Sequence, residues 1–73
     1  MSKVSDAFEV IKQAMIDDSP EERGSYAHVW HCNIAMAVYD STTDDISAEA
    51  AKDIGNEAAT RFMKNCFNVE TKQ

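Results

Sequence analysis

Hydrophobic residues recur along three segments of the chain at the three- and four-residue spacing of amphipathic helices. No stretch alternates apolar and polar residues, with β-branched enrichment, as a strand would. The pattern therefore predicts an all-α fold with helices over about residues 3–16, 26–39 and 48–68. The first helix carries its apolar residues on one stripe: Val4, Ala7, Phe8, Ile11, Ala14 and Met15.

Two short polar segments connect the predicted helices. In the first, "SPEE" has the spacing of a capped single turn, and Ser25 is placed to cap the helix that follows. The second, "DSTTDDIS", is rich in residues that bond to their own backbone, and it ends at a Ser47 cap. Neither is long enough to separate domains. Residues 1–73 are expected to form one compact three-helix domain, in which the first helix packs on a hairpin of the other two.

The second predicted helix is apolar on almost every side. On a helical wheel of about 100° per residue, one broad face is expected to form the core: Tyr26, Ala27, Trp30, Ile34, Ala37 and Val38. The opposite side is also apolar and carries Val29, Cys32, Met36 and Tyr39. A helix of this kind is expected to be buried on two sides.

Small side chains line the first half of the third predicted helix. Gly55 lies among them and costs about 1 kcal/mol relative to alanine in a helix interior. We expect this glycine to admit a bulky neighbour from the second helix, either Trp30 or Tyr26.

The second apolar face must meet either neighbouring helices or another molecule. Two large apolar residues of the third helix also lie off its small-residue stripe. We therefore expect a contact surface for a second copy of the chain or for a protein partner, formed by Met36, Tyr39, Met63 and Phe67. The alternative is a monomer whose first helix covers these side chains.

The chain is short and acidic, with 73 residues and a formal net charge of −6. A domain of this size buries only about 60% of its unfolded surface, so self-association would help to stabilise it. Lys and Arg are absent between Gly24 and Ala51, where Asp40, Asp44 and Asp45 fall. This charge favours a basic protein partner and disfavours direct binding to nucleic acid or to an anionic membrane. Alternatively, the acid only maintains solubility, or it mimics nucleic acid and occupies a basic host protein.

Two histidines and a cysteine cluster on the second predicted helix: His28, His31 and Cys32. Two of the three could reach one zinc ion from the same helix. A structural zinc site needs four ligands, however, and Cys66 has no second thiol or histidine beside it. We expect no metal and no cofactor, with the histidines at the border of the apolar face and the thiol packed. The alternative is a small-ligand or metal-binding regulator that uses this cluster at a subunit interface.

The sequence contains no recognisable catalytic motif. Neighbouring residues on a helix point about 100° apart, so His31 cannot act as a base for Cys32. A Gly-rich phosphate loop and a G-x-S-x-G motif are both absent. The N-terminal residues lack the apolar core of a signal peptide, and no stretch approaches the roughly 20 apolar residues of a membrane span. A non-enzymatic, cytoplasmic protein is expected.

Two segments on successive helices carry further patterns, W-x-C-N-I-A-M-A in "YAHVWHCNIAMAVYD" and A-A-x-R-F-M in "GNEAATRFMKNCFNVET". Over about residues 25–71 the chain resembles small accessory proteins encoded by phages and prophages. The resemblance implies action in the cytoplasm of an infected bacterium, where such proteins commonly bind and modulate a host factor. It assigns no catalytic residue.

Overall fold

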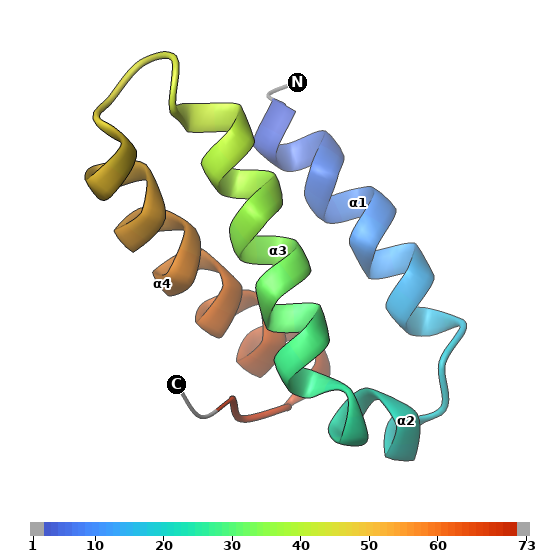
Figure 1. Ribbon diagram of the computed structural model, residues 1–73. Helices are drawn as coiled ribbons and strands as arrows, with labels where there is room; N and C mark the ends of the chain where they lie inside the picture. Colours follow the sequence, from blue (N-terminus) through green and yellow to red (C-terminus); the bar gives the residue numbers. More distant parts are fainter. Residues whose placement is uncertain (1–2, 72–73) are drawn as a thin grey trace.

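The computed structural model describes residues 3–71 and contains four helices (Figure 1). They are α1 (Lys3–Ile16), α2 (Pro20–Ser25), α3 (Ala27–Thr42) and α4 (Ala48–Phe67). Within residues 3–71 there is no strand, so the predicted all-α class is confirmed. The bounds of α1 match the prediction, and the capped single turn expected after it is the short helix α2.

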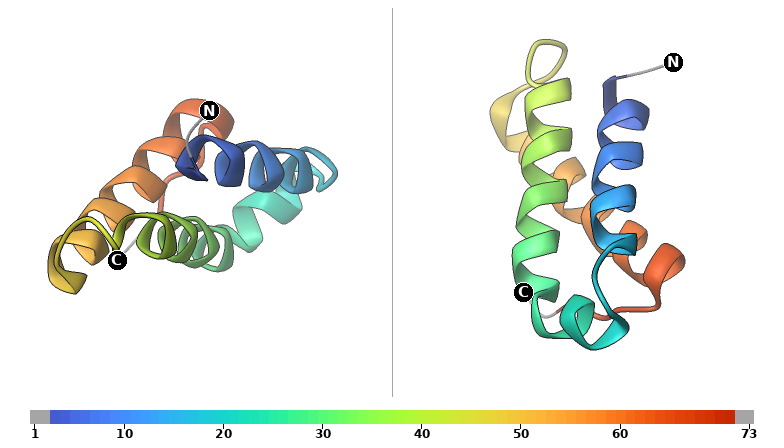
Figure 2. Two further views of the ribbon diagram at one scale, coloured as in Figure 1. Left: turned by 90° about the horizontal axis from the view of Figure 1, so that it is seen from above. Right: turned by 90° about the vertical axis from the view of Figure 1, so that its right-hand side faces the viewer.

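α3 is the central element of the fold. α1 lies beside it and runs in the opposite direction, while α4 crosses both obliquely on the other side (Figures 1 and 2). The extents along the principal axes are 36 × 27 × 16 Å, so the molecule is much thinner in one direction than in the other two. α3 packs against every other helix, and one of its sides is left facing outward.

The helix ends follow local hydrogen bonding. Ser19 caps α2, since its hydroxyl accepts from the N–H of Glu22 at 3.2 Å and its own N–H donates back to the Glu22 carboxylate. The hydroxyl of Ser47 caps α4 by accepting from the N–H of Ala50. The expected Ser25 cap of α3 is wrong: Ser25 belongs to α2, and Tyr26 occupies the cap position without a side-chain bond. The chain passes from α2 into α3 with no residues between them except Tyr26.

α3 ends three residues later than predicted, at Thr42. The hydroxyl of Ser41 donates to the carbonyl of Ala37 at 2.9 Å, and that of Thr42 donates to the carbonyl of Val38 at 2.8 Å. These side chains bond to the preceding helical turn instead of forming the loop that their composition indicated. α4 ends as predicted within one residue, at Asn68, which adopts the left-handed conformation with φ of 53°.

The core lies where the three long helices meet. Met15 of α1, Ile34 of α3 and Met63 of α4 are completely buried there. Phe8 of α1 packs on Phe62 of α4 with ring centroids 4.8 Å apart, which ties the first helix to the last. The expectation that Met63 is exposed for partner contact is wrong, because it lies in the same buried cluster as Met15 of α1 and Ile34 of α3.

The exposed position expected for Phe67 is also wrong. It is half-buried against the core, with its ring centroid 5.9 Å from that of Phe62. The guanidinium of Arg23 lies over its other face, 5.2 Å from the centroid. Phe67 therefore closes one end of the core and does not join an open apolar patch.

Gly55 permits a close approach of two helix backbones. A Cβ placed on it would lie 2.6 Å from the carbonyl oxygen of Ala35 in α3, which is closer than real Cβ contacts come. The expected role for a glycine is thus present, but the neighbour is the α3 backbone and neither Trp30 nor Tyr26. Trp30 instead packs against the core and donates its Nε1–H to Asp18 at 3.2 Å, and the Tyr26 side chain is exposed.

Arg23 joins the end of α1 to the rest of the fold. Its Nη1 donates to the carbonyl oxygens of Met15 at 3.1 Å and of Asp18 at 2.8 Å. The last carbonyls of a helix have no partner within that helix, so an arginine that binds them stabilises the helix end. α1 has no basic residue in its own last turn, and Arg23 of α2 supplies the missing cation.

Candidate interaction surface

The outward side of α3 is apolar and open to solvent. We call the set Val29, Cys32, Met36 and Tyr39 the outer face of α3. Val29 is 53% exposed and Met36 is 58% exposed, Cys32 is also exposed, and Tyr39 is half-buried. The second apolar face expected from the sequence therefore exists, and the described part of this chain does not cover it.

A groove runs along one edge of this face, between α3 and α4. Its α3 wall includes Cys32, Met36 and Tyr39, and its α4 wall is formed by Lys52 and Asn56. Ala35 also lines it, at the point where Gly55 lets the two helices approach. The groove thus lies along the close contact of the α3 and α4 backbones.

The outer face lies in a part of the chain without formal charge. From Gly24 to Tyr39 the sequence contains no Asp, Glu, Lys or Arg, although the chain carries 13 acidic residues in total. A net charge of −6 opposes the approach of a second copy. This repulsion is weakest on the outer face of α3, where apolar side chains are also exposed.

The two histidines of the predicted His28–His31–Cys32 cluster have separate environments. His31 is only 7% exposed, and its Nε2 lies 3.1 Å from the hydroxyl of Thr60 on α4. That hydroxyl also donates to the carbonyl of Asn56 at 2.9 Å, so Thr60 links the buried imidazole to the backbone of α4. The border position expected for His31 is wrong, because α4 brings a hydrogen-bonding partner to the buried side of α3.

His28 and Cys32 face outward together. Both are exposed, and the sulfur of Cys32 lies 3.8 Å from Nε2 of His28, one helical turn away. The packed thiol expected at Cys32 is therefore wrong. Among residues 3–71, no group of three or more His, Cys, Asp or Glu side chains is arranged to hold a metal ion. Within one chain, then, the three-residue cluster divides into a buried histidine and an exposed His–Cys pair.

The acidic residues expected to face a partner lie near one end of the molecule. Asp40 is exposed in the last turn of α3, and Asp44 and Asp45 are exposed in the loop that follows. The loop aspartates border a hollow with Lys3 and Val4 at the start of α1. The chain reversal between α3 and α4 thus brings these carboxylates to the end where α1 begins (Figure 1).

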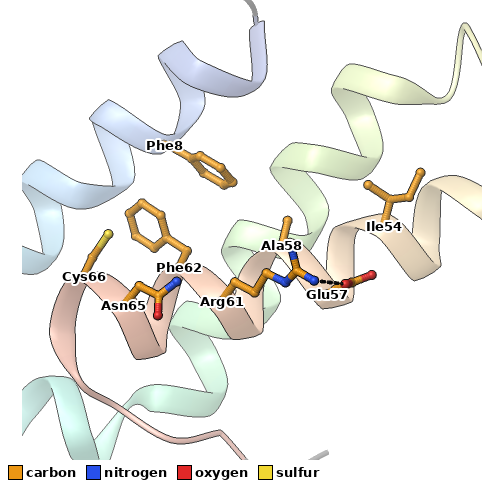
Figure 3. A pocket seen from close by; sticks show the side chains of 8 residues that line it. All are labelled: Phe8, Ile54, Glu57, Ala58, Arg61, Phe62, Asn65 and Cys66. Atoms are coloured by element: carbon orange, nitrogen blue, oxygen red, sulfur yellow. Dashed lines mark ion pairs between the residues drawn. The ribbon is translucent and has the colours of Figure 1, made fainter.

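A second groove lies between α1 and α4, and sequence reasoning missed it. Figure 3 shows Phe8 and Phe62 stacked at one end of it and Ile54 standing alone at the other. Arg61 and Glu57 form an ion pair of 2.7 Å along its rim. Ile54 is 46% exposed and belongs to the first half of α4. α1 diverges from this half of the helix (Figure 2).

No protein-family model, curated protein or solved structure matches this chain. Among residues 3–71, no helix combines the length and the apolar character that crossing a membrane requires.

Proposed function

We propose that this protein is a non-enzymatic interaction module that associates with itself through the outer face of α3 and binds a basic protein partner through its acidic end. The observation that carries the proposal is the exposure of large apolar side chains, Val29 and Met36, on the central helix of the fold. Exposed apolar side chains that lie in a row on one helix are characteristic of contact surfaces.

Self-association suits the size of the chain. Covering apolar surface contributes about 25 cal/mol for each Å² removed from water, and a domain this short has a small core of its own. A two-fold dimer uses the same surface on both copies, so each apolar residue of the outer face meets an apolar counterpart. The uncharged sequence around α3 supports this surface over the charged surfaces elsewhere.

A basic partner is supported by the placement of acid at the end of α3. Asp40 lies in the last helical turn, close to the negative end of the helix dipole, where a negative side chain costs stability. No basic residue occupies that turn. An approaching Lys- or Arg-rich surface would relieve this repulsion, and the field of the acidic end would speed its approach.

The biological setting of the proposal comes from the resemblance to phage and prophage accessory proteins. We place the protein in the cytoplasm of an infected bacterium, where it modulates a host factor.

The first test is the mass of the protein in solution across a dilution series, measured by sedimentation or light scattering. We expect a dimer at high micromolar concentration that dissociates on dilution, as an interface of modest area would. A mass equal to one chain throughout this range would contradict self-association.

The second test concerns the partner. Affinity capture from bacterial lysate with the wild-type chain should enrich one basic protein. The same capture with Asp40→Asn, Asp44→Asn and Asp45→Asn combined should lose it, and raised salt should weaken its binding to the wild type. Equal capture by the wild-type and substituted chains would remove the acidic end from the proposal.

A further inference from the structure

We infer that His28 and Cys32 form one half of a zinc site, which a second copy of the chain completes with its own His28 and Cys32. The inference rests on the self-association proposed above and assigns a metal ion to the same interface. It would place one Zn²⁺ on the two-fold axis, bound by two imidazole nitrogens and two thiolates.

The geometry of the pair suits this metal. In a tetrahedral site with Zn–S of about 2.3 Å and Zn–N of about 2.0–2.1 Å, the sulfur and nitrogen ligands lie about 3.6 Å apart. The observed separation of Cys32 Sγ and His28 Nε2 is 3.8 Å. The two side chains therefore already stand at the spacing that zinc requires, on consecutive turns of a long helix.

One chain supplies only these two ligands. His31 is only 7% exposed and its Nε2 is hydrogen-bonded to Thr60 of α4, so it does not share the exposed side of α3 with the pair. Cys66 lines the groove between α1 and α4, away from the outer face of α3. No third His, Cys, Asp or Glu of residues 3–71 joins the pair. A four-coordinate site accordingly needs an outside source of two more ligands.

The position of the pair makes a second copy the natural source. Cys32 belongs to the outer face of α3, and His28 lies one turn before it on the same exposed side. In a two-fold dimer through this face, a residue near the axis approaches its own counterpart. Two His–Cys pairs brought together in this way give the Cys₂His₂ ligand set of structural zinc sites.

Zinc binding would leave the net charge of the dimer unchanged. Each Cys32 thiol releases its proton to solvent on binding, and the two thiolates neutralise the charge of the ion. The site thus adds no net charge to the outer face of α3, beside which Lys52 lines the groove, and it replaces two weak thiol contacts with metal–ligand bonds. Apolar contact and zinc binding then both favour the dimer over the monomer.

The test uses the full chain without a histidine tag, kept reduced, with either ZnCl₂ or a chelator present. We expect one zinc bound per two chains and a dimer dissociation constant at least about tenfold lower with zinc than with the chelator. His28→Ala and Cys32→Ser should each abolish zinc retention and the zinc-dependent part of dimerisation. Cys66→Ser is the matched control and should change neither.

The outcomes separate this inference from the proposed function. A dimer that forms equally well with chelator and with zinc would overturn the zinc site and leave self-association intact. One zinc per chain without a change in mass would overturn the shared site, as would zinc retention in the His28→Ala variant. A chain that stays monomeric under both conditions would contradict the zinc site and the proposed dimer together.

Discussion

Nε2 of His31 and the hydroxyl oxygen of Thr60 are joined by a hydrogen bond of 3.1 Å across the contact between α3 and α4. The two residues are separated by almost half the chain, and the bond gives a buried histidine its partner. His28 lies one turn earlier on the same helix and is exposed. Two histidines that look equivalent in the sequence therefore have different roles.

Replacing each histidine by alanine should reveal this difference. His31→Ala leaves a cavity and removes the hydrogen bond to Thr60, so we expect a loss of about 2–4 kcal/mol in the free energy of unfolding. His28→Ala, measured in chelator, should change it by no more than about 0.5 kcal/mol. Urea denaturation of both variants measures these values. Similar losses for the two would contradict the assignment of His31 to the core.

The two glycines form a second matched pair. Gly55→Ala would push a methyl group against the Ala35 carbonyl, and the overpacking cost of about 1–3 kcal/mol should exceed the roughly 1 kcal/mol gained in helix propensity. Gly24→Ala has nothing within 4 Å of its new Cβ and should stabilise the protein by about 0.5–1 kcal/mol. The unfolding temperature should therefore fall for Gly55→Ala and rise for Gly24→Ala. A stabilising Gly55→Ala would mean that the helices are less closely packed.

Arg23 should control the attachment of α1. Arg23→Ala removes both hydrogen bonds to the carbonyls at the end of α1 and the contact with Phe67, for an expected loss of about 1–3 kcal/mol. Amide hydrogen exchange should accelerate most in α1, because that helix loses its anchor. Uniform acceleration across α3 and α4 as well would indicate global destabilisation instead.

Met36→Asp tests the outer face of α3 without disturbing the core. The side chain is 58% exposed, so the variant should fold, while its charge should raise the dimer dissociation constant at least about tenfold. Val10→Asp on α1 is a matched control, because Val10 is 71% exposed and lies on a different helix. Only the first variant should change the mass measured by sedimentation. An unchanged mass for Met36→Asp would mean that the dimer interface lies on another surface.

Neutralising two acidic residues that lie at opposite ends of their helices should change the free energy of unfolding with opposite signs. Asp40→Asn removes a negative charge from the last turn of α3 and should stabilise the protein by about 0.3–1 kcal/mol at low salt. Glu49→Gln removes one from the first turn of α4 and should destabilise it by a similar amount. Both effects should shrink in 1 M salt, about the concentration at which charges are screened beyond 3 Å. A destabilising Asp40→Asn would mean that this carboxylate has a structural partner.

Local signals in the sequence were sufficient to predict most helix ends. The capping box of Ser19 and Glu22 is complete within four residues, and Ser47 acts on a backbone group three positions away. Ser41 and Thr42 show the limit of such reasoning. Their hydroxyls can favour a loop or bond to the preceding helical turn, and composition does not distinguish the two.

The wrong predictions concern residues whose burial depends on a segment that is distant in the sequence. His31 is buried with a partner, Thr60, on another helix, and Met63 is buried in a cluster that residues of α1 and α3 share. A helical wheel reports the direction of a side chain on its own helix and carries no information about which helix lies opposite. The apolar character of the outer face of α3 was predictable from the sequence, whereas its exposure required the structure. The His28–Cys32 distance required the structure.

The thinnest dimension of the protein, 16 Å between Cα extremes, is about that of two helices packed with their axes 8–10 Å apart. A fold with so little depth cannot enclose a helix on all sides. If two copies join through α3, the helices stack in the order α4, α3, α3, α4, and both copies of α3 become interior elements. The sequence of α3, which is apolar on nearly every side, would then suit a helix at the centre of a dimer and not one at the surface of a monomer.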